Sequence, residues 1–457
     1  MIARPNLVPV YRNFHAFDLL AAKQEPRYTD AGLFYSQIMT TVSRLLLSFF
    51  LGIQVAIVNT GVAAEEIVAP VSDDVEIMIT RFPAQGEYLL IWLAPEYGFR
   101  KAHRSLADRL PEQNIEVWQA DIVESLFLPQ GNSSLKQLDG KYIADLIEYA
   151  HRLTGKNIVV SGDSYAAMSA LLGARRWQGR NQADSYLVGA ILFSPYSYAY
   201  IPPLGLPPEY MPIVESTNIP LVIYQAQNSG IVGQFDELLA KLRTNDSPIY
   251  TRMVPDVMSL FYEEEPTPAM KNSAQPIPGS IRLMLPVLAR HEIPAMPVPL
   301  KQTLTAESGI DIYLKDFNGN NEPVAFTLTD INGNTIVKSD FSRKVTVVNF
   351  WATWCPPCIE EIPSLNRLKQ KMEGRPFELI SINYAEDRST VAKFLQQVKV
   401  DFPVLLDHSG ATAHRWNVIT YPSTFVIDRQ GKFRYGVNAA IEWDTPELIQ
   451  KLESLMN

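Results

Sequence analysis

Both cysteines of the 457-residue chain stand in one segment, Trp354-Cys355-Pro356-Pro357-Cys358. An apolar run over 345–351, typical of a buried strand, precedes it, and a helical pattern from Ile359 to Met372 follows. Cysteines so spaced at a strand-to-helix junction suit reversible dithiol–disulfide chemistry. The first cysteine then lies at a helix N-terminus, where free N–H groups and the helix dipole favour a thiolate. The alternative, half of a zinc site, has no second cysteine pair and no histidine near in sequence.

The length of the chain predicts two domains rather than one. Its composition is that of a globular protein, with 47% hydrophobic and 19% charged residues. A net charge of −9 gives no electrostatic reason to expect nucleic acid as a partner. We expect no metal and no cofactor.

Residues 1–64 are interpreted as an N-terminal extension that ends in an export signal. Arg44 precedes an apolar run over 45–58, and Val62-Ala63-Ala64 offers small residues for cleavage. The run is shorter than the roughly 20 residues that span a bilayer. Because about 40 residues precede it, we expect translation to start at Met39 and the mature chain to begin near Glu65. The alternative is a buried helix or an uncleaved anchor, which would be the chain's one contact with a membrane.

Export, to the periplasm or otherwise out of the cytoplasm, would bring the chain into an oxidising compartment. Two cysteines then allow one intramolecular disulfide. A bridge that closes so short a loop constrains the unfolded chain little, which favours a working dithiol over a structural bridge.

The C-terminal part, 311–457, alternates strand-like and helix-like segments and predicts an α/β domain with a central sheet. The expected strands are 326–330, 345–351, 377–383 and 421–428, and the expected helices are 359–372, 389–398 and 445–455.

The same part resembles the TlpA/ResA family of exported thioredoxin-like proteins over the last third of the chain. The resemblance rests on the segments 326–333, 348–358, 361–363 and 421–428. It implies a thioredoxin fold and thiol–disulfide exchange with protein thiols and disulfides. It also favours disulfide reduction, which requires an upstream electron donor.

The resemblance implies roles for four residues. Cys355 would be the exposed nucleophile that forms a mixed disulfide, and Cys358 would resolve that intermediate. Pro422 matches the family's cis-proline opposite the dithiol, although only about one X–Pro bond in twenty is cis. Tyr421 would present its backbone to an extended substrate.

Further residues are expected to border the same groove. Trp354 and Pro356 are predicted to contact the substrate. Trp351 either walls the site or packs in the core. Thr420 stands where the family often has glycine, which would narrow the groove.

Exchange also needs a proton acceptor for the buried thiol. Asn349, in the strand before the motif, cannot titrate, and the resemblance points instead to Glu361. This residue lies three positions after Cys358 on the same helical face. A partly buried carboxylate can exchange protons near neutrality. The alternative is a first-turn glutamate favoured by the helix dipole, a role that suits Glu360 better.

The N-terminal part, 70–292, predicts a mostly parallel, doubly wound sheet with helices on both faces. The expected strands include 88–93, 115–118, 189–193 and 220–224, and the expected helices include 101–110 and 138–153. The segment from Asn157 leads through a turn into a helix that reaches Arg175.

That turn, Gly162-Asp163-Ser164-Tyr165-Ala166, resembles the nucleophile elbow of α/β-hydrolases, with alanine in place of the last glycine. The acid and the histidine that should follow later strands are missing, and His103 and His151 are interpreted as surface residues. A serine without its base is a poor nucleophile. We therefore favour a hydrolase-like domain that has lost catalysis and serves binding. The rival hypothesis is a serine esterase that uses Ser164 with His291, the thioredoxin-like domain being an accessory.

A proline-rich segment over 293–310 is predicted to join the two domains as an extended, semi-rigid linker. The sequence thus predicts an exported thiol–disulfide oxidoreductase fused to a hydrolase-like domain. A third hypothesis is a binding protein in which neither site turns over.

Overall fold

The computed structural model describes residues 64–180, 185–257, 259–261, 268–301 and 313–456. Apart from Ala64, the expected extension and export signal lie outside these residues, so the start at Met39 remains a prediction. Within the described ranges, none of the helices has the length and apolarity that a membrane span requires.

The N-terminal sheet has the strand order β1-β2-β4-β3-β5-β6-β7-β8. From β4 onward in this order the neighbouring strands pair in parallel, as the sequence predicted, whereas β1 and β2 form an antiparallel hairpin that pairs with β4. The hairpin was not predicted, and β1 begins five positions before the expected start at residue 70. The strands are β1 (Glu65–Pro70), β2 (Glu76–Phe82), β3 (Tyr88–Leu93), β4 (Ile115–Ala120), β5 (Asn157–Asp163), β6 (Leu187–Phe193), β7 (Leu221–Ala226) and β8 (Ile249–Val254).

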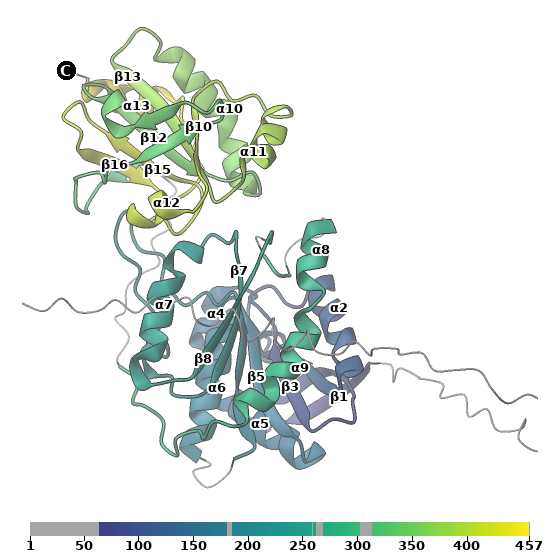
Figure 1. Ribbon diagram of the computed structural model, residues 1–457. Helices are drawn as coiled ribbons and strands as arrows, with labels where there is room; N and C mark the ends of the chain where they lie inside the picture. Colours follow the sequence, from purple (N-terminus) through teal and green to yellow (C-terminus); the bar gives the residue numbers. More distant parts are fainter. Residues whose placement is uncertain (1–63, 181–184, 258, 262–267, 302–312, 457) are drawn as a thin grey trace, which may run out of the picture. The chain divides into compact units, whose positions relative to one another are not determined.

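Helices cover both faces of this sheet (Figure 1). On one face, α5 and α6 pack together on an apolar cluster that includes Ile91 and Leu93. Trp92, between these two residues, points to the opposite face and packs on Phe193 and Phe261. Side chains that point alternately to two buried faces are typical of a strand in a sheet that is covered on both sides. The helices are α2 (Lys101–Arg109), α3 (Ile122–Ser125), α4 (Asn132–Gln137), α5 (Lys141–Thr154), α6 (Ala166–Arg180), α7 (Phe235–Leu242), α8 (Pro268–Ala274) and α9 (Ile277–Leu288).

The helix pair α5 and α6 depends on a glycine at the start of α5. Gly140 has φ +85°, and a Cβ atom there would lie 2.4 Å from the carbonyl carbon of Leu172. Both the left-handed backbone and the close approach of α6 therefore require glycine. Gly155, with φ +68°, ends α5 in the left-handed conformation common after helices.

The C-terminal sheet has the strand order β11-β10-β14-β13-β12-β15-β16-β9. Its central strand β12 is buried along its whole length, pairs in parallel with β13 and is antiparallel to β15. The predicted α/β pattern with a central sheet is confirmed. The strands are β9 (Lys315–Asp316), β10 (Thr327–Asp330), β11 (Thr335–Val337), β12 (Val345–Trp351), β13 (Phe377–Tyr384), β14 (Val404–Asp407), β15 (Ser423–Ile427) and β16 (Phe433–Val437).

The helices of this part are α10 (Pro356–Lys371), α11 (Arg388–Leu395), α12 (Ala411–Arg415) and α13 (Pro446–Ser454). Leu365 of α10 and Leu452 of α13 share an apolar cluster with Trp443. The side chain of Thr445 accepts a hydrogen bond from the N–H of Leu448, which caps α13. The segment 445–455 is thus helical as the sequence predicted.

The described half of the proline-rich segment is fixed along the N-terminal part. Arg175 Nε donates to the carbonyl of Val298 at 2.9 Å, and Asn218 Nδ2 donates to that of Met296 at 3.0 Å. Gln178 donates to the carbonyl of Pro294. Over 294–298 the segment is therefore hydrogen-bonded to the N-terminal part, whereas its prolines predicted a semi-rigid spacer. Residues 302–310 lie outside the described ranges.

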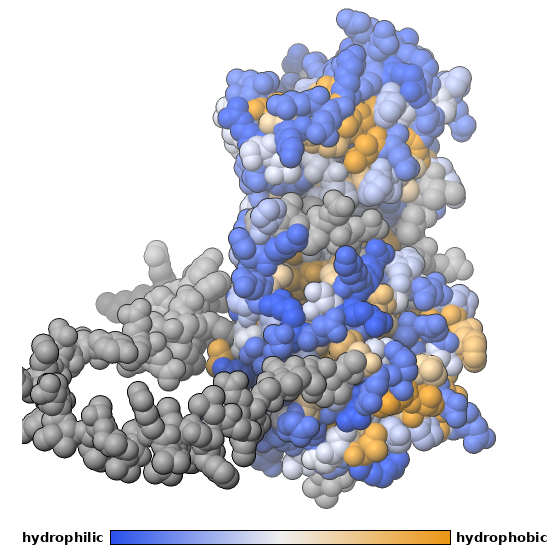
Figure 2. Space-filling view, turned by 90° about the vertical axis from the view of Figure 1, so that its right-hand side faces the viewer, coloured by the Kyte–Doolittle hydropathy of each residue, from blue (hydrophilic) through white to orange (hydrophobic). Residues whose placement is uncertain are grey.

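The described surface is mainly polar on the face drawn in Figure 2, where hydrophobic side chains form separate small patches. Phe127 is the most exposed of the large hydrophobic residues described, at 96%. Isolated exposed hydrophobic residues of this kind are common on globular proteins.

Candidate active site

The two cysteines form a disulfide at the start of α10, with Cα atoms 5.3 Å apart. Cys355 is the N-cap of the helix, and its Sγ accepts a hydrogen bond from the N–H of Cys358 at 3.3 Å. Pro356 follows at the first helical position, where no backbone donor is needed. The first sulfur thus faces the free N–H groups of the helix, an environment that stabilises a thiolate.

The predicted exposure of Cys355 is wrong for this oxidised state. Cys355 is 4% exposed and Cys358 is 1% exposed. The sulfurs lie in an apolar cluster that includes Ile362 of α10 and the partly buried Trp354 and Tyr421. Packing in this cluster leaves the disulfide little exposed to solvent.

Two of the residues expected to form the substrate groove, Trp354 and Tyr421, pack against the disulfide. The peptide bond from Tyr421 to Pro422 is cis, as the resemblance implied. The rings of Trp354 and Tyr421 meet edge to face with centroids 5.9 Å apart. Pro356, the first residue of α10, is exposed.

Of the two predicted positions for Trp351, a wall of the site or the core, the structure shows the core. It is 2% exposed, and its Nε1 donates to Ser381 Oγ at 3.0 Å. Its ring packs on Phe394 of α11. Trp351 therefore supports the end of β12 from within the core.

Glu361 is a buried carboxylic acid, not a first-turn surface residue. It is 3% exposed, and its two oxygens accept hydrogen bonds from Asn349 Nδ2 at 2.7 Å and from Trp443 Nε1 at 3.1 Å. Burial raises the pKa of Glu361 to about 7, while the hydrogen bonds from Trp443 and Asn349 oppose the rise. The residue can therefore exchange protons near neutral pH, as a proton acceptor for Cys358 must.

The raised pKa of Glu361 predicts that the protein loses stability as the pH rises. Glu361 carries its proton up to about pH 7 in the folded state but only up to about pH 4.5 in the unfolded state. Its contribution to the stability of the fold is therefore complete below pH 4.5 and is lost as the pH rises through 7. The shift corresponds to about 3 kcal/mol. Chemical denaturation should show that the free energy of unfolding falls less between pH 4.5 and pH 8 in Glu361→Gln than in the parent. Equal losses in the two proteins would contradict a buried, protonated Glu361.

A second buried carboxylate, not anticipated from the sequence, holds the loop before the disulfide. Glu386 is 5% exposed and accepts hydrogen bonds from the backbone N–H of Thr353 at 2.8 Å, from the Thr353 hydroxyl and from Asn383 Nδ2 at 2.7 Å. Burial raises its pKa. Glu386 follows the end of β13, which pairs in parallel with β12, the strand before the cysteines. A polar residue just after a parallel strand next to the site is the sequence signal that could have identified it.

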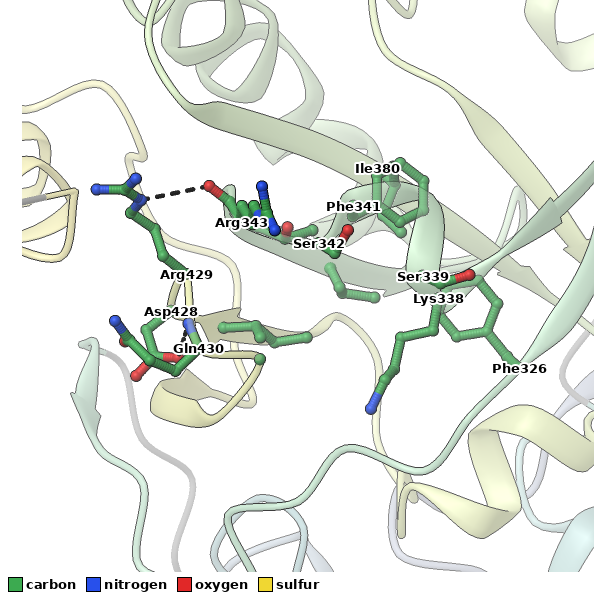
Figure 3. Close-up of a pocket in the computed structure, with 14 residues that line it drawn as sticks. Phe326, Lys338, Ser339, Phe341, Ser342, Arg343, Ile380, Asp428, Arg429 and Gln430 are labelled. Carbon is green, nitrogen blue, oxygen red and sulfur yellow. Dashed lines mark hydrogen bonds between the residues drawn. The ribbon is translucent and has the colours of Figure 1, made fainter.

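One cavity of this part is separate from the disulfide. It measures about 180 Å³ and includes Thr346 and Val348 of β12 in its lining, whereas the cysteines follow the other end of that strand. Lys338 and Arg429 extend away from its centre, and Arg429 Nε donates to the carbonyl of Arg343 at 3.3 Å (Figure 3). The cavity is therefore no part of the candidate active site.

Ser164 of the N-terminal part occupies an elbow between β5 and α6, with φ +53°. Its hydroxyl donates to Glu96 Oε1 at 3.0 Å. His291, the histidine of the esterase hypothesis, pairs instead with the hydroxyl of Tyr250 through Nε2 at 2.8 Å. The structure thus brings Ser164 to a carboxylate that the sequence reasoning missed.

The interpretation of His103 as a surface residue is wrong. It is fully buried, its ring stacks on that of Phe261 with centroids 4.3 Å apart, and its Nε2 lies 3.4 Å from Asp163 Oδ2. His151 is half-buried and stacks on Tyr186 with centroids 3.8 Å apart. Both rings also make polar contacts, His103 Nδ1 with the N–H of Arg100 and His151 Nδ1 with the carbonyl of Lys156.

Comparison with known proteins places the C-terminal part. Residues 319–436 match the AhpC/TSA family. The thiol-disulfide oxidoreductase ResA of Geobacillus kaustophilus is 32% identical over 160 residues, which are 33% of this chain and 90% of that protein. The chain belongs to the ResA family of thiol-disulfide oxidoreductases. The resemblance inferred from the last third of the sequence is confirmed.

Other members of the ResA family match over a shorter stretch. ResA of Bacillus thuringiensis is 37% identical over 107 residues, so the chain spans 62% of the length of that relative. A solved structure, of a secreted Mycobacterium tuberculosis disulfide oxidoreductase homologous to E. coli DsbE, is 27% identical and covers 28% of this chain and 96% of its own, with a TM-score of 0.26.

Proposed function

We propose that the chain is an exported thiol–disulfide oxidoreductase that reduces disulfides in protein substrates through Cys355 and Cys358. The observation that carries the proposal is the disulfide at the first turn of α10, against which Trp354 and Tyr421 pack, with a cis peptide bond from Tyr421 to Pro422. Membership in the ResA family supports the same reaction class.

The reaction begins from the reduced dithiol. The Cys355 thiolate attacks one sulfur of a substrate disulfide, and the other substrate sulfur leaves as a thiolate. Cys358, as its thiolate, then attacks Cys355 in the mixed disulfide and releases the substrate as a dithiol. The chain ends with the Cys355–Cys358 disulfide, which an upstream electron donor reduces again.

Glu361 supplies the proton transfer in this scheme. Its ionised form accepts the proton of the Cys358 thiol, which must be lost before that sulfur can attack. Because the pKa of Glu361 is about 7, both of its protonation states are populated at neutral pH. Asn349 and Trp443 hold its two oxygens in place.

Export is supported by the signal-like segment that ends at Ala64. The surroundings in an oxidising compartment do not regenerate the reduced dithiol. The proposal therefore requires an electron donor outside this chain. We propose the periplasm or an equivalent exported location as the site of action.

The test is a single turnover without excess reductant. Protein reduced and then freed of dithiol should reduce one insulin disulfide per molecule and regain the Cys355–Cys358 bridge, as measured by mass after alkylation. Retention of both free thiols in the presence of insulin would contradict the proposal.

For the N-terminal part we propose an α/β-hydrolase-like domain, supported by the strand order from β1 to β8 and by the Ser164 elbow. An esterase as the main function is not favoured, since the chain belongs to the ResA family and His291 is held by Tyr250. Binding or scaffolding is the role we assign to this domain within the redox function.

A further inference from the structure

The elbow at Ser164 is held in a fixed shape by its neighbours. The N–H of Ser164 donates to the carbonyl of Phe193 at 3.1 Å, and the carbonyl of Ser164 accepts from the N–H of Tyr196 at 3.1 Å. A Cβ atom on Gly162 would lie 2.3 Å from the carbonyl carbon of Ala166, so the turn needs glycine at its start. This close approach occurs at Ala166, where the usual pattern has a second glycine.

Glu96 meets this elbow from the loop between β3 and α2. Its Oε1 accepts the hydrogen bond from the Ser164 hydroxyl at 3.0 Å. Its Oε2 is buried and has no hydrogen-bond partner among the described residues. One oxygen is thus directed at the serine proton, and the other has an unfilled acceptor position.

The surroundings of Glu96 raise the pKa of its carboxyl group. Burial raises the pKa of Glu96, and the nearby Asp163 acts in the same direction. The Ser164 hydroxyl and the backbone N–H groups of Glu96 and Tyr165 oppose the rise. A carboxylate with a raised pKa is a stronger base than a solvated one and suits proton abstraction.

Histidine does not fill this role in the described structure. His103 is buried against Asp163 and Phe261, and His291 is bonded to Tyr250. A serine nucleophile needs a base within hydrogen-bond reach, and Glu96 meets that distance.

We propose that Ser164 and Glu96 form a second catalytic site that hydrolyses carboxylic esters, with Ser164 as nucleophile and Glu96 as general base. Ser164 Oγ bonds to the acyl carbon, the bond to the alcohol oxygen breaks, and Glu96 passes the serine proton to the leaving alcohol. Water then attacks the acyl-enzyme, gives its proton through Glu96 to Ser164 Oγ and releases the acid.

The experiment measures the rate at which a fluorophosphonate probe labels the purified full chain, with the labelled residue identified by peptide mass spectrometry. The parent should be labelled at Ser164, and Ser164→Ala should not be labelled. Glu96→Gln keeps the shape of the side chain but removes its basicity, so labelling should slow about 100-fold or more. Glu96→Asp, which retracts the carboxylate, should give a smaller loss and serves if the glutamine variant fails to fold.

Two controls separate this site from other effects. Glu112→Gln, at an exposed glutamate of the same part, and Cys355→Ser should both be labelled at the parent rate. A folded parent that is not labelled overturns the proposal. Labelling of Glu96→Gln at the parent rate or faster overturns it as well, because the carboxylate would then be a spectator or a block on the serine.

Discussion

Cys355→Ser is expected to abolish the reduction of protein disulfides, leaving only the rate of buffer alone. Without Sγ at the N-cap of α10, no thiolate attacks the substrate and no mixed disulfide forms. Serine keeps the polar N-cap, so the helix should persist. Insulin reduction with a dithiol donor measures the loss, and thermal unfolding checks the fold.

Cys358→Ser is the matched control for this prediction. It keeps the attacking sulfur but removes the resolving one, so the variant should accumulate a mixed disulfide with its substrate. Residual turnover in Cys355→Ser close to that of the parent would contradict the assignment of Cys355. A mixed disulfide trapped on Cys355→Ser rather than on Cys358→Ser would reverse the two roles.

Glu361→Gln is expected to slow exchange by about 10²-fold or more, the lower end of what a positioned proton acceptor contributes. In the parent, the rate should rise with pH through about 7, as Glu361 ionises and accepts the Cys358 proton. The variant should lose that rise, since the amide cannot titrate. Stopped-flow measurement of exchange from pH 6 to 9 gives both the rate and its pH dependence.

Glu360→Gln provides the control, because Glu360 is the exposed neighbour on the same helix. It should retain the parent's rate and pH profile. Identical rates for Glu361→Gln and the parent across pH 6–9 would remove Glu361 from the mechanism.

Local signals in the sequence were sufficient for the centre of the redox site. The uniform apolar run over 345–351 predicted β12, and the cysteine pair with two prolines predicted the start of α10. The cis bond before Pro422 came from the family resemblance, because nothing local in a sequence fixes an X–Pro isomer.

Contacts between distant segments were not predictable in the same way. Trp443 donates to Glu361 across 82 residues, and Glu386 holds Thr353 across 33. Such pairs leave no periodic pattern in one sequence. They depend on which strand ends and loops the sheet brings together.

The errors in the N-terminal part have physical reasons too. His103 comes before the elbow and was interpreted as a surface residue, yet 103, 106 and 107 form the buried face of α2. Histidine was the only base considered for Ser164, so Glu96 was not predicted. Glu96 lies in the loop after β3 and contacts the elbow. The hairpin of β1 and β2 lies at the sheet edge, where only Ile77, Ile79 and Phe82 of β2 are buried.

The most direct test of the central claim is a redox titration of residues 65–457 in dithiol buffers, followed by tryptophan fluorescence, to which Trp354 beside the disulfide contributes. A disulfide reductase should show a potential near that of thioredoxin, about −270 mV, or lower. A potential near about −120 mV would contradict the account and make the chain a donor of disulfides.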